Sequence, residues 1–512
     1  MRIALHVALL LAATWLLCPS GSDAAQFDRQ AWEADYRALK AELERSYAHL
    51  AWLASPEGGV DLPALDRATT QALQRAHGDA EAAAALKAFI AGFHDAHLSS
   101  TSMPAAAPSD AVGPPVAAPQ PDARAACVAW GYGPDTHIQF SLPFESLPGF
   151  TLVSDGLSDA FRAGLIDVGS QRIGLVRVPR FRANEFPALC ERVWASLRAS
   201  HKEPTREAVA DDVSAEWLRT LATRLRQLRE RQAVVVLVDL GDNGGGNDLG
   251  DWAVRLFTSA PVHSAPMLLT AGPAGVPYFD AQLKDLRAVL GKNADLPEAT
   301  RLAVQQGITA FEHLRQEATG TTCDLSWVWR ERRVWRAQRC KRLVDGGFAS
   351  GHLDYAAPEA LDRRAAPSLY WASAADPMRG AWSGPIYVYT DKWTGSAAEC
   401  FVALMRDRGI ARTLGARTRG MGCGFADRDE PVVLQHAHLA FKVPNCMRLR
   451  ADGTDDMAGV APDFPLSAQP GESSRALALR ALKTIAADAA TPVNTPASST
   501  AAPETTPRTP AR

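Results

Sequence analysis

The chain has 512 residues, 47% of them hydrophobic, and a formal net charge of -3. This length suits two or three compact units, and the nearly balanced charge excludes a global attraction to nucleic acid or to acidic membranes. The composition is that of an ordinary globular protein.

Residues 1–25 predict a secretory signal peptide. Arg2 supplies a basic start, a short apolar run follows, and small residues in SDAA offer a cleavage site. The run is too short for a comfortable membrane span, and no later segment is continuously apolar. We therefore expect a secreted or periplasmic bacterial protein without a membrane span.

Seven cysteines remain after the signal peptide, and in an oxidising compartment some of them should pair. Their odd number leaves at least one free thiol. No CxxC spacing occurs, so a zinc site of cysteines is not indicated. The favoured pair is Cys323–Cys340, because these two cysteines bracket one local segment.

Residues 26–102 predict an N-terminal helical domain. Apolar side chains recur there at spacings of three and four, which is typical of one buried helix face: Trp32, Tyr36, Leu39, Leu43 and Tyr47. Residues 103–126 follow as a Pro/Ala-rich linker with little capacity to bury surface.

Residues 127–485 predict an α/β core, because strand-turn-helix units alternate along them. Strands are expected in HIQFSLPF, FTLV and RIGLVRVPRF, helices over 183–230, and a strand in AVVVLVDLGDNGGG that is buried on both faces. Further along, GPIYVYT predicts a second buried strand followed by a helix, and VVLQHAHLAFKV predicts one alternating strand.

Two segments stand apart from this core. Residues 262–382 look like an insertion, in which CDLSWVWRERRVWRAQRC predicts a disulfide-closed hairpin with three tryptophans on one face. Such a hairpin is either a lid whose arginines receive a peptide carboxylate, or a surface element that packs its tryptophans on the core. Residues 486–512 are expected to be disordered.

Ser396 lies in TDKWTGSAAECF, at the step from an apolar strand into a helix. It could be the N-cap of that helix, with Glu399 completing an SxxE capping box. It could also be a nucleophile, since small neighbours leave its hydroxyl accessible and the helix start presents free N–H groups.

Two other motifs could contribute chemistry. The glycine run DLGDNGGG is either a tight turn or a source of backbone donors, and it matches neither phosphate-binding loop pattern. The segment GFHDAHLSS, residues 92–100, could cap a helix, supply a general base or hold a metal. His436 and His438 would share one face of their strand, either as a metal site or as a half-exposed pair.

These motifs together resemble the tail-specific (C-terminal processing) and tricorn-core family of serine peptidases. The resemblance covers roughly residues 27–100, 172–258 and 384–466, in the order AGFHDAHLSS, RIGLVRVPRF, VVVLVDLGDNGGG, the Ser396 segment and DGTDDMAGVAPDF. It implies a crotonase-like core of strand-strand-helix units and a peptide or protein substrate. It implies no cofactor and no metal.

Carried over by motif, the resemblance makes Ser396 the nucleophile. It places the oxyanion hole at the N–H of Ala397 and that of Gly244 or Gly245. One branch of the family uses a lysine in a motif like TxGKG, but Met421 stands at that position here and cannot accept a proton. The resemblance therefore implies the tricorn-like branch, with His97 of the DxH motif as the base.

Further residues are implied as support. Asp456 stands where the family usually has a glutamate that orients the network, and Ala96 replaces a serine of the tricorn pattern. Asp95 and Glu399 are expected to support the site. A full PDZ domain does not fit between His97 and the RIGLVRVPRF strand, although FRAGLIDVGS is similar to a PDZ helix.

The sequence thus predicts a secreted serine peptidase. The alternative is a catalytically degenerate member of the same fold that binds a peptide or an apolar ligand. The sequence leaves the oligomeric state and the cleavage preference open.

Overall fold

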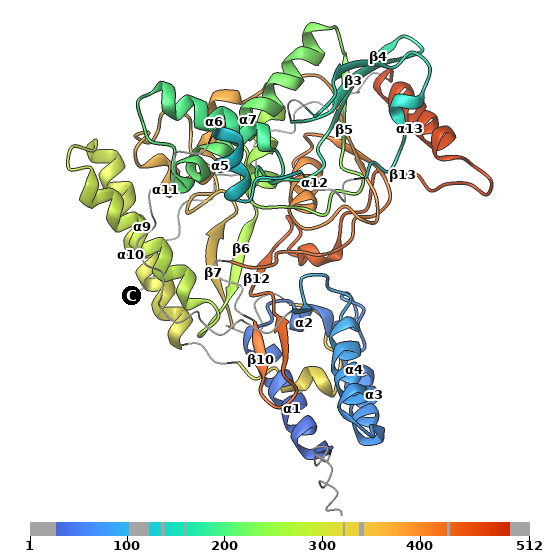
Figure 1. Ribbon diagram of the computed structural model, residues 1–512, viewed down its shortest axis with the longest axis vertical. Coiled ribbons are helices and arrows are strands. Elements are labelled where there is room, and N and C mark those ends of the chain that lie inside the picture. The colour runs from blue at the N-terminus through green and yellow to red at the C-terminus, as the bar shows by residue number, and fades with distance from the viewer. Residues whose placement is uncertain are drawn as a thin grey trace, which may run out of the picture.

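The computed structural model describes residues 27–101, 122–134, 139–157, 160–320, 323–336, 342–426 and 431–491. The expected signal peptide and most of the expected linker lie outside these ranges, as does most of the expected tail. Figure 1 shows two bodies: a lower helical unit, and an upper body built around the largest sheet. None of the helices in these ranges is long and apolar enough to cross a bilayer.

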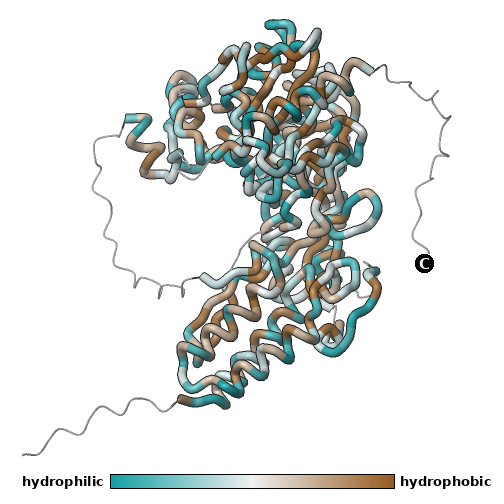
Figure 2. Tube along the Cα trace, turned by 90° about the vertical axis from the view of Figure 1, so that its right-hand side faces the viewer, coloured by the Kyte–Doolittle hydropathy of each residue, from teal (hydrophilic) through white to brown (hydrophobic). Residues whose placement is uncertain are grey.

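The lower body is built mainly from helices within residues 29–91. Its helices are α1 (Arg29–Ser46), α2 (Leu50–Leu53), α3 (Leu62–Arg75) and α4 (Asp79–Ala91). The carboxylates of Asp28 and Asp61 accept the N–H groups of Ala31 and Ala64, so α1 and α3 each begin at a capping aspartate. Apolar positions recur along these helices (Figure 2), and the predicted face from Trp32 to Tyr47 is buried.

The core of this helical unit also takes residues from far along the chain. Trp329, from the short helix η3 (Ser326–Trp329), and Phe441 are part of it. A small antiparallel sheet adds to the unit, in the order β1 (Ser99–Thr101), β11 (Leu439–Lys442) and β10 (Val432–Leu434).

The upper body contains a seven-stranded mixed sheet, as the α/β prediction requires. Its order is β13 (Phe464–Pro465), β9 (Arg412–Gly415), β8 (Ile386–Thr390), β5 (Val235–Asp239), β4 (Gln171–Arg177), β3 (Ala163–Val168) and β2 (Thr151–Ser154). The pairs from β13 to β4 are parallel, and the last two pairs are antiparallel.

Strand β5 is buried on both faces, as predicted from its continuous apolar run. Val236 and Val238 pack in the core that contains α7 (Arg206–Glu230). Val235 and Leu237 face the opposite core, which α13 (Ser474–Ala489) covers. This sandwiching holds the carboxyl end of β5 in a fixed place.

Smaller elements complete the upper body. They are α5 (Ala123–Ala129), η1 (Phe144–Ser146), α6 (Pro187–Ala199), α8 (Leu249–Trp252), η2 (Ala253–Phe257), α12 (Ala397–Asp407) and η5 (Asp456–Ala458). Helices α6 and α7 confirm the helices expected over 183–230. Helix α5 begins inside the expected linker, and α13 extends four residues into the expected tail, to Ala489.

The expected insertion forms its own small sheet with a later strand. Strands β6 (Pro266–Thr270) and β7 (Leu343–Phe348) pair, and β12 (Cys446–Arg448) adds to β6. Two long helices, α9 (Val276–Lys292) and α10 (Glu298–Gly320), extend beside it (Figure 1), and α11 (Ala366–Leu369) and η4 (Trp371–Met378) lead back to β8.

Two disulfides join described cysteines, Cys127–Cys190 and Cys423–Cys446. Cys323 is also disulfide-bonded, and its favoured partner Cys340 lies outside the described residues. Cys400 is a free, buried thiol, as the odd count requires.

Two strand predictions before β4 are corrected by the structure. In HIQFSLPF, the described residues form no strand and end in η1, because Pro143 has no N–H to donate to a sheet. FRAGLIDVGS is not a helix: it contains β3, which forms a hairpin with β4 through Gly169 at a φ of 61°.

Two further corrections concern the later segments. The tryptophan segment is not a hairpin in its described part, where Trp329 packs at 5.8 Å from Phe89 in the helical unit. VVLQHAHLAFKV is two strands, β10 and β11, joined by a turn with no Gly or Pro to reveal it. His436 and His438 lie in that turn and not on one strand face.

Candidate active site

Two turns meet at the carboxyl ends of β5 and β8. These strands are parallel neighbours, so the glycine run after β5 and the segment before Ser396 emerge at the same sheet edge. The carbonyl oxygen of Asn243 accepts the N–H of Gly395 at 2.9 Å, and the Thr394 hydroxyl donates to the Leu240 carbonyl oxygen at 2.8 Å. The structure therefore brings together two segments that the sequence separates by about 150 residues.

Ser396 has a backbone conformation that few non-glycine residues adopt, with φ 55° and ψ -121°. Such strain costs about 1–3 kcal/mol and persists only where the surroundings impose it. Gly245 is the immediate neighbour: a Cβ atom there would lie 2.6 Å from the Ser396 Cβ. The arrangement is a sharp strand-to-helix turn with a serine at its apex, the geometry that exposes a nucleophilic hydroxyl.

The predicted capping box is also present. The Glu399 carboxylate accepts the Ser396 N–H at 2.9 Å, and the Ser396 side chain faces the first turn of α12. A hydroxyl that accepts a hydrogen bond keeps its own proton to donate. The capping role and the nucleophilic role are therefore compatible.

The N–H groups predicted to form the oxyanion hole differ in their hydrogen bonding. The N–H of Gly245 is occupied by the Asn243 side-chain oxygen at 2.8 Å. Within the described residues, neither the Gly244 nor the Ala397 N–H donates to any acceptor. Of the two glycines left open by the sequence, Gly244 is thus the one with a free N–H group.

His97 is held through both its ring and its backbone. Its Nδ1 lies 3.1 Å from the Met421 carbonyl oxygen, and its N–H donates to the Asp95 carboxylate at 2.8 Å. A carbonyl oxygen only accepts, so Nδ1 carries the proton and Nε2 has the lone pair. Burial lowers the pKa of His97, more than Asp95 raises it, so the ring is neutral at neutral pH.

Met421 contacts both the histidine and the residue before the serine. Its carbonyl oxygen binds His97, whereas its side chain lies against Gly395, where a Cβ atom would contact the sulfur. Within the described part of the chain, no hydrogen bond joins His97 to the Ser396 hydroxyl. Catalytic hydrogen bonds of this kind often tighten only when substrate binds.

Glu399 links the serine to the loop that holds the histidine. Its buried carboxylate accepts the N–H groups of Ser396, Gly420 and Met421, at 2.9, 2.5 and 2.8 Å, and the Thr418 hydroxyl at 2.6 Å. Burial raises the pKa of Glu399, against the effect of the Thr418, Met421 and Gly420 hydrogen bonds. One carboxylate thus fixes both the elbow and residues 418–421.

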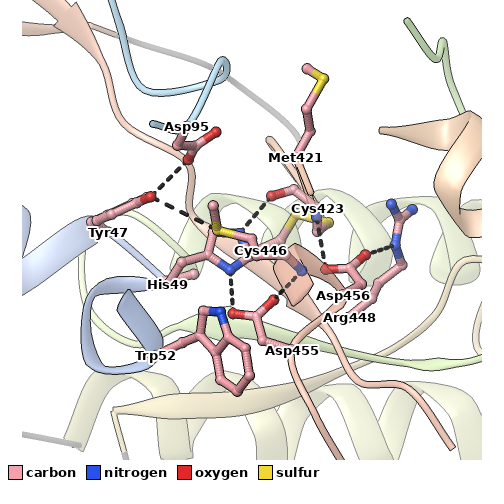
Figure 3. A network of polar contacts seen from close by, with 12 residues as sticks. Tyr47, His49, Trp52, Asp95, Met421, Cys423, Cys446, Arg448, Asp455 and Asp456 are labelled. Carbon is pink, nitrogen blue, oxygen red and sulfur yellow. Dashed lines mark hydrogen bonds and ion pairs between the residues drawn. A yellow bond between two sulfur atoms is a disulfide. The ribbon is translucent and has the colours of Figure 1, made fainter. Parts of the chain in front are cut away.

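Asp95 and Asp456, the two aspartates predicted to support the site, have different neighbours. Asp95 is the carboxylate beside His97, 3.9 Å from Nδ1. Asp456 accepts the Arg448 Nε–H at 2.9 Å and the Cys423 N–H at 3.2 Å, so its contacts reach the loop after Met421 (Figure 3). The Met421 side chain is directed away from this network.

Metal ligation is one alternative for the histidines of GFHDAHLSS and of VVLQHAHLAFKV. The described residues contain no group of three His, Cys, Asp or Glu side chains placed to hold a metal ion. His94 is exposed, and His436 packs edge-on against Trp32 at 5.6 Å.

Several residues of this site carry no motif, and the sequence analysis missed them. Asn243 orders the glycine turn, and Thr418 binds Glu399. Tyr47 and His49 reach the site from the end of α1 and the start of α2. The signal that could have found Tyr47 is a polar hydroxyl on an otherwise apolar helix face.

A family model gives the class of protein. The model for peptidase family S41 matches residues 172–466, which is more than half of the chain. The chain therefore belongs to peptidase family S41, and this membership indicates a peptidase. A comparison with curated proteins finds no match.

Solved structures support the fold. The chain is similar to mature CPAF complexed with lactacystin, at 12% identity and a TM-score of 0.52, over 90% of this chain and 99% of that one. Another structure of mature CPAF gives 13% identity and a TM-score of 0.50, over 90% and 98% of the two chains. At these identities the likeness concerns the fold alone.

Proposed function

We propose that this protein is a secreted bacterial serine peptidase that cleaves peptide bonds through an acyl-enzyme on Ser396, with His97 as general base. The strained turn at Ser396, packed against Gly245 and flanked by the free N–H of Ala397, is the observation that carries the proposal. A serine used only as a helix cap has ordinary extended dihedrals and needs no such strain.

The residues have these roles in the proposed reaction. His97 Nε2 takes the proton of the Ser396 hydroxyl while its oxygen attacks the scissile carbonyl carbon. The N–H groups of Ala397 and Gly244 stabilise the oxyanion. The amine leaves with the proton from Nε2, and a water then repeats the two steps and releases the acid.

Of the two supporting carboxylates, Asp95 lies beside the His97 ring, whereas Asp456 contacts the loop that holds it. Asp95 would favour the imidazolium that forms on His97, because it is the nearest carboxylate to the ring. Asp456 would act through the Cys423 N–H and not by direct contact with the ring. The proposal places this mechanism on a crotonase-like core of the tricorn-like branch, without a full PDZ domain.

Secretion fits the chemistry of the chain. The two described disulfides are compatible with an oxidising compartment, and the sequence of residues 1–25 predicts a signal peptide.

One observation favours the degenerate peptide- or ligand-binding alternative. No hydrogen bond joins His97 to the Ser396 hydroxyl within the described residues, so the pair must close further for catalysis. The two functions differ in whether the serine can be acylated.

A fluorophosphonate probe decides between them, because it reacts with an activated serine. The wild-type protein should be labelled and should hydrolyse a mixed peptide library, whereas Ser396→Ala should do neither. The matched control is Ser473→Ala, since Ser473 caps α13 by accepting the Ala476 N–H and makes none of the contacts described for the site. Peptide binding without labelling or hydrolysis would favour the degenerate alternative.

A further inference from the structure

A buried polar network joins the helical unit to the candidate site (Figure 3). His49 and Asp455 are fully buried, and their side chains meet at 2.6 Å between Nδ1 and Oδ2. The other ring nitrogen of His49, Nε2, lies 2.9 Å from the carbonyl oxygen of Cys423. None of these three residues belongs to the catalytic set proposed above.

The geometry fixes the charge of His49. Both of its ring nitrogens face acceptors, a carboxylate oxygen and a carbonyl oxygen, so both must carry protons. Burial alone would lower the pKa of His49, but the charges of Asp455, Asp95 and Asp456 raise it to about 9. The aromatic ring of Tyr47 packs edge-on at 5.8 Å and adds no charge.

Cys423 is held at three points. Its carbonyl oxygen accepts from His49, its N–H donates to Asp456, and its sulfur is bonded to Cys446. Cys423 follows Met421 by two residues, and the Met421 carbonyl oxygen sets the tautomer of His97. The position of His49 is thus transmitted to the catalytic ring through one short loop.

The same segment of the helical unit also holds the other side of His97. The Tyr47 hydroxyl donates to Asp95 at 2.7 Å, and Asp95 accepts the His97 N–H. Tyr47 and His49 are two residues apart. Their two contacts fix the backbone of His97 and, through the 421–423 loop, its ring.

We infer that His49, as an imidazolium paired with Asp455, is a positioning residue for the reaction. It keeps the Met421 carbonyl oxygen on Nδ1 of His97, so that Nε2 is the nitrogen free to accept the serine proton. The inference rests on the proposed function for its catalytic meaning, but its structural content is independent of it.

The pKa values of His49 and Asp455 give the pH range over which their ion pair exists. The pKa of Asp455 is raised to about 6, chiefly by burial, and that of His49 to about 9. The ion pair therefore exists between about pH 6 and pH 9. Because the pKa of His49 is raised on folding, its stabilising contribution is complete below its ordinary value and is lost as the pH rises through about 9.

The test reads the His97 tautomer directly by ¹⁵N NMR of histidine-labelled protein. Asp455→Asn removes the partner charge, so His49 should lose its proton near neutral pH and His97 should populate both tautomers. The labelling rate should fall by as much as about 10²-fold, the cost of a small misplacement at an active site. Asp354→Asn is the matched control, because Asp354 makes a His–Asp pair of 2.7 Å with the exposed His263.

A wild-type pH titration gives the same information if Asp455→Asn does not fold. The tautomer of His97 should begin to mix as His49 deprotonates near pH 9. A His97 ring that keeps its Nδ1–H tautomer in Asp455→Asn, or throughout the titration of His49, overturns the inference. A wild-type protein that is never labelled, yet whose His97 tautomer follows His49, overturns only the proposed peptidase activity.

Discussion

The proposed nucleophile, Ser396, and the proposed base, His97, are held by regions of different construction. Ser396 is positioned by residues within ten places of it and by the glycine turn of the neighbouring strand. His97 depends on contacts across 324 residues to Met421, while the residues that hold its loop join across 406 residues, from His49 to Asp455. The serine side is thus the more local in the chain, although its contacts with the glycine turn span about 150 residues, and the histidine side is assembled only by the complete fold.

This difference predicts unequal sensitivity. Local contacts re-form easily after a perturbation, whereas long-range contacts require several segments to be placed together. We therefore expect changes remote from the active site to impair the base before they impair the nucleophile.

The largest effect is expected for His97→Ala. Loss of the general base should slow fluorophosphonate labelling and hydrolysis by about 10²- to 10⁴-fold without unfolding the protein. His94→Ala is a suitable control, since His94 is exposed and makes none of the contacts of His97. An unchanged labelling rate would show that another group activates Ser396.

A second variant sharpens this result by changing the source of the base. The buried Met421 side chain lies against Gly395, beside the serine, so a lysine there would be partly desolvated and its pKa lowered. We expect Met421→Lys, combined with His97→Ala, to recover about tenfold in labelling over His97→Ala alone. No recovery, with the double variant folded by circular dichroism, would contradict this placement.

Gly245→Ala tests the local side of the comparison. The added methyl group would collide with Ser396, Gly395 and Ala397, and the φ of 109° is unfavourable for alanine. The elbow should shift and activity should fall by about 10²-fold, measured as kcat/KM on a peptide. Gly291→Ala in α9, where a Cβ atom meets nothing within 4 Å, should leave kcat/KM unchanged.

Removing each of the two described disulfides in turn distinguishes an effect on the free energy of unfolding from an effect on the position of His97. In the chain-entropy account, removing Cys127–Cys190 should cost about 4 kcal/mol and removing Cys423–Cys446 about 3 kcal/mol, because they close 63 and 23 residues. Only the second should also slow labelling, by about tenfold, because Cys423 lies in the loop that holds His97. Equal loss of labelling in both variants, at matched folded fractions, would argue against a special role for that loop.

The smallest effect is expected in the dependence of the labelling rate on pH below pH 7. Burial lowers the pKa of His97, so the neutral base is present above a pKa that lies below the usual value for histidine. The labelling rate should rise with pH through that depressed pKa and should already be level at pH 7. A midpoint above 6.5 would mean that the ring is less buried, or more strongly paired with Asp95, than its contacts indicate.

The same contrast explains what the sequence could predict. Ser396, its strand and its helix are adjacent in the chain, so periodicity, capping and glycine placement indicate them together. The burial of β5 on both faces could be predicted from its run of apolar residues. The contact of Asp456 with the Cys423 N–H and the pairing of His49 with Asp455 have no local signature, since they join groups 33 and 406 residues apart that only the fold brings together.

The wrong secondary-structure predictions have a related cause. The turn between β10 and β11 contains His438 at a φ of 48°. A glycine at this position would have indicated a turn, whereas a histidine does not. Trp329 and Trp335 look like a surface pattern in isolation. They are explained only by Phe89 and Trp52 of the helical unit, against which they pack.

The contact between His49 and Asp455 also bears on biosynthesis. The helical unit leaves the ribosome first, and domains generally begin to fold in that order. Yet the imidazole of His49 meets its partner only after residue 455 has been made. On the proposed function, a growing chain therefore carries no finished catalytic centre until nearly all of it has been synthesised.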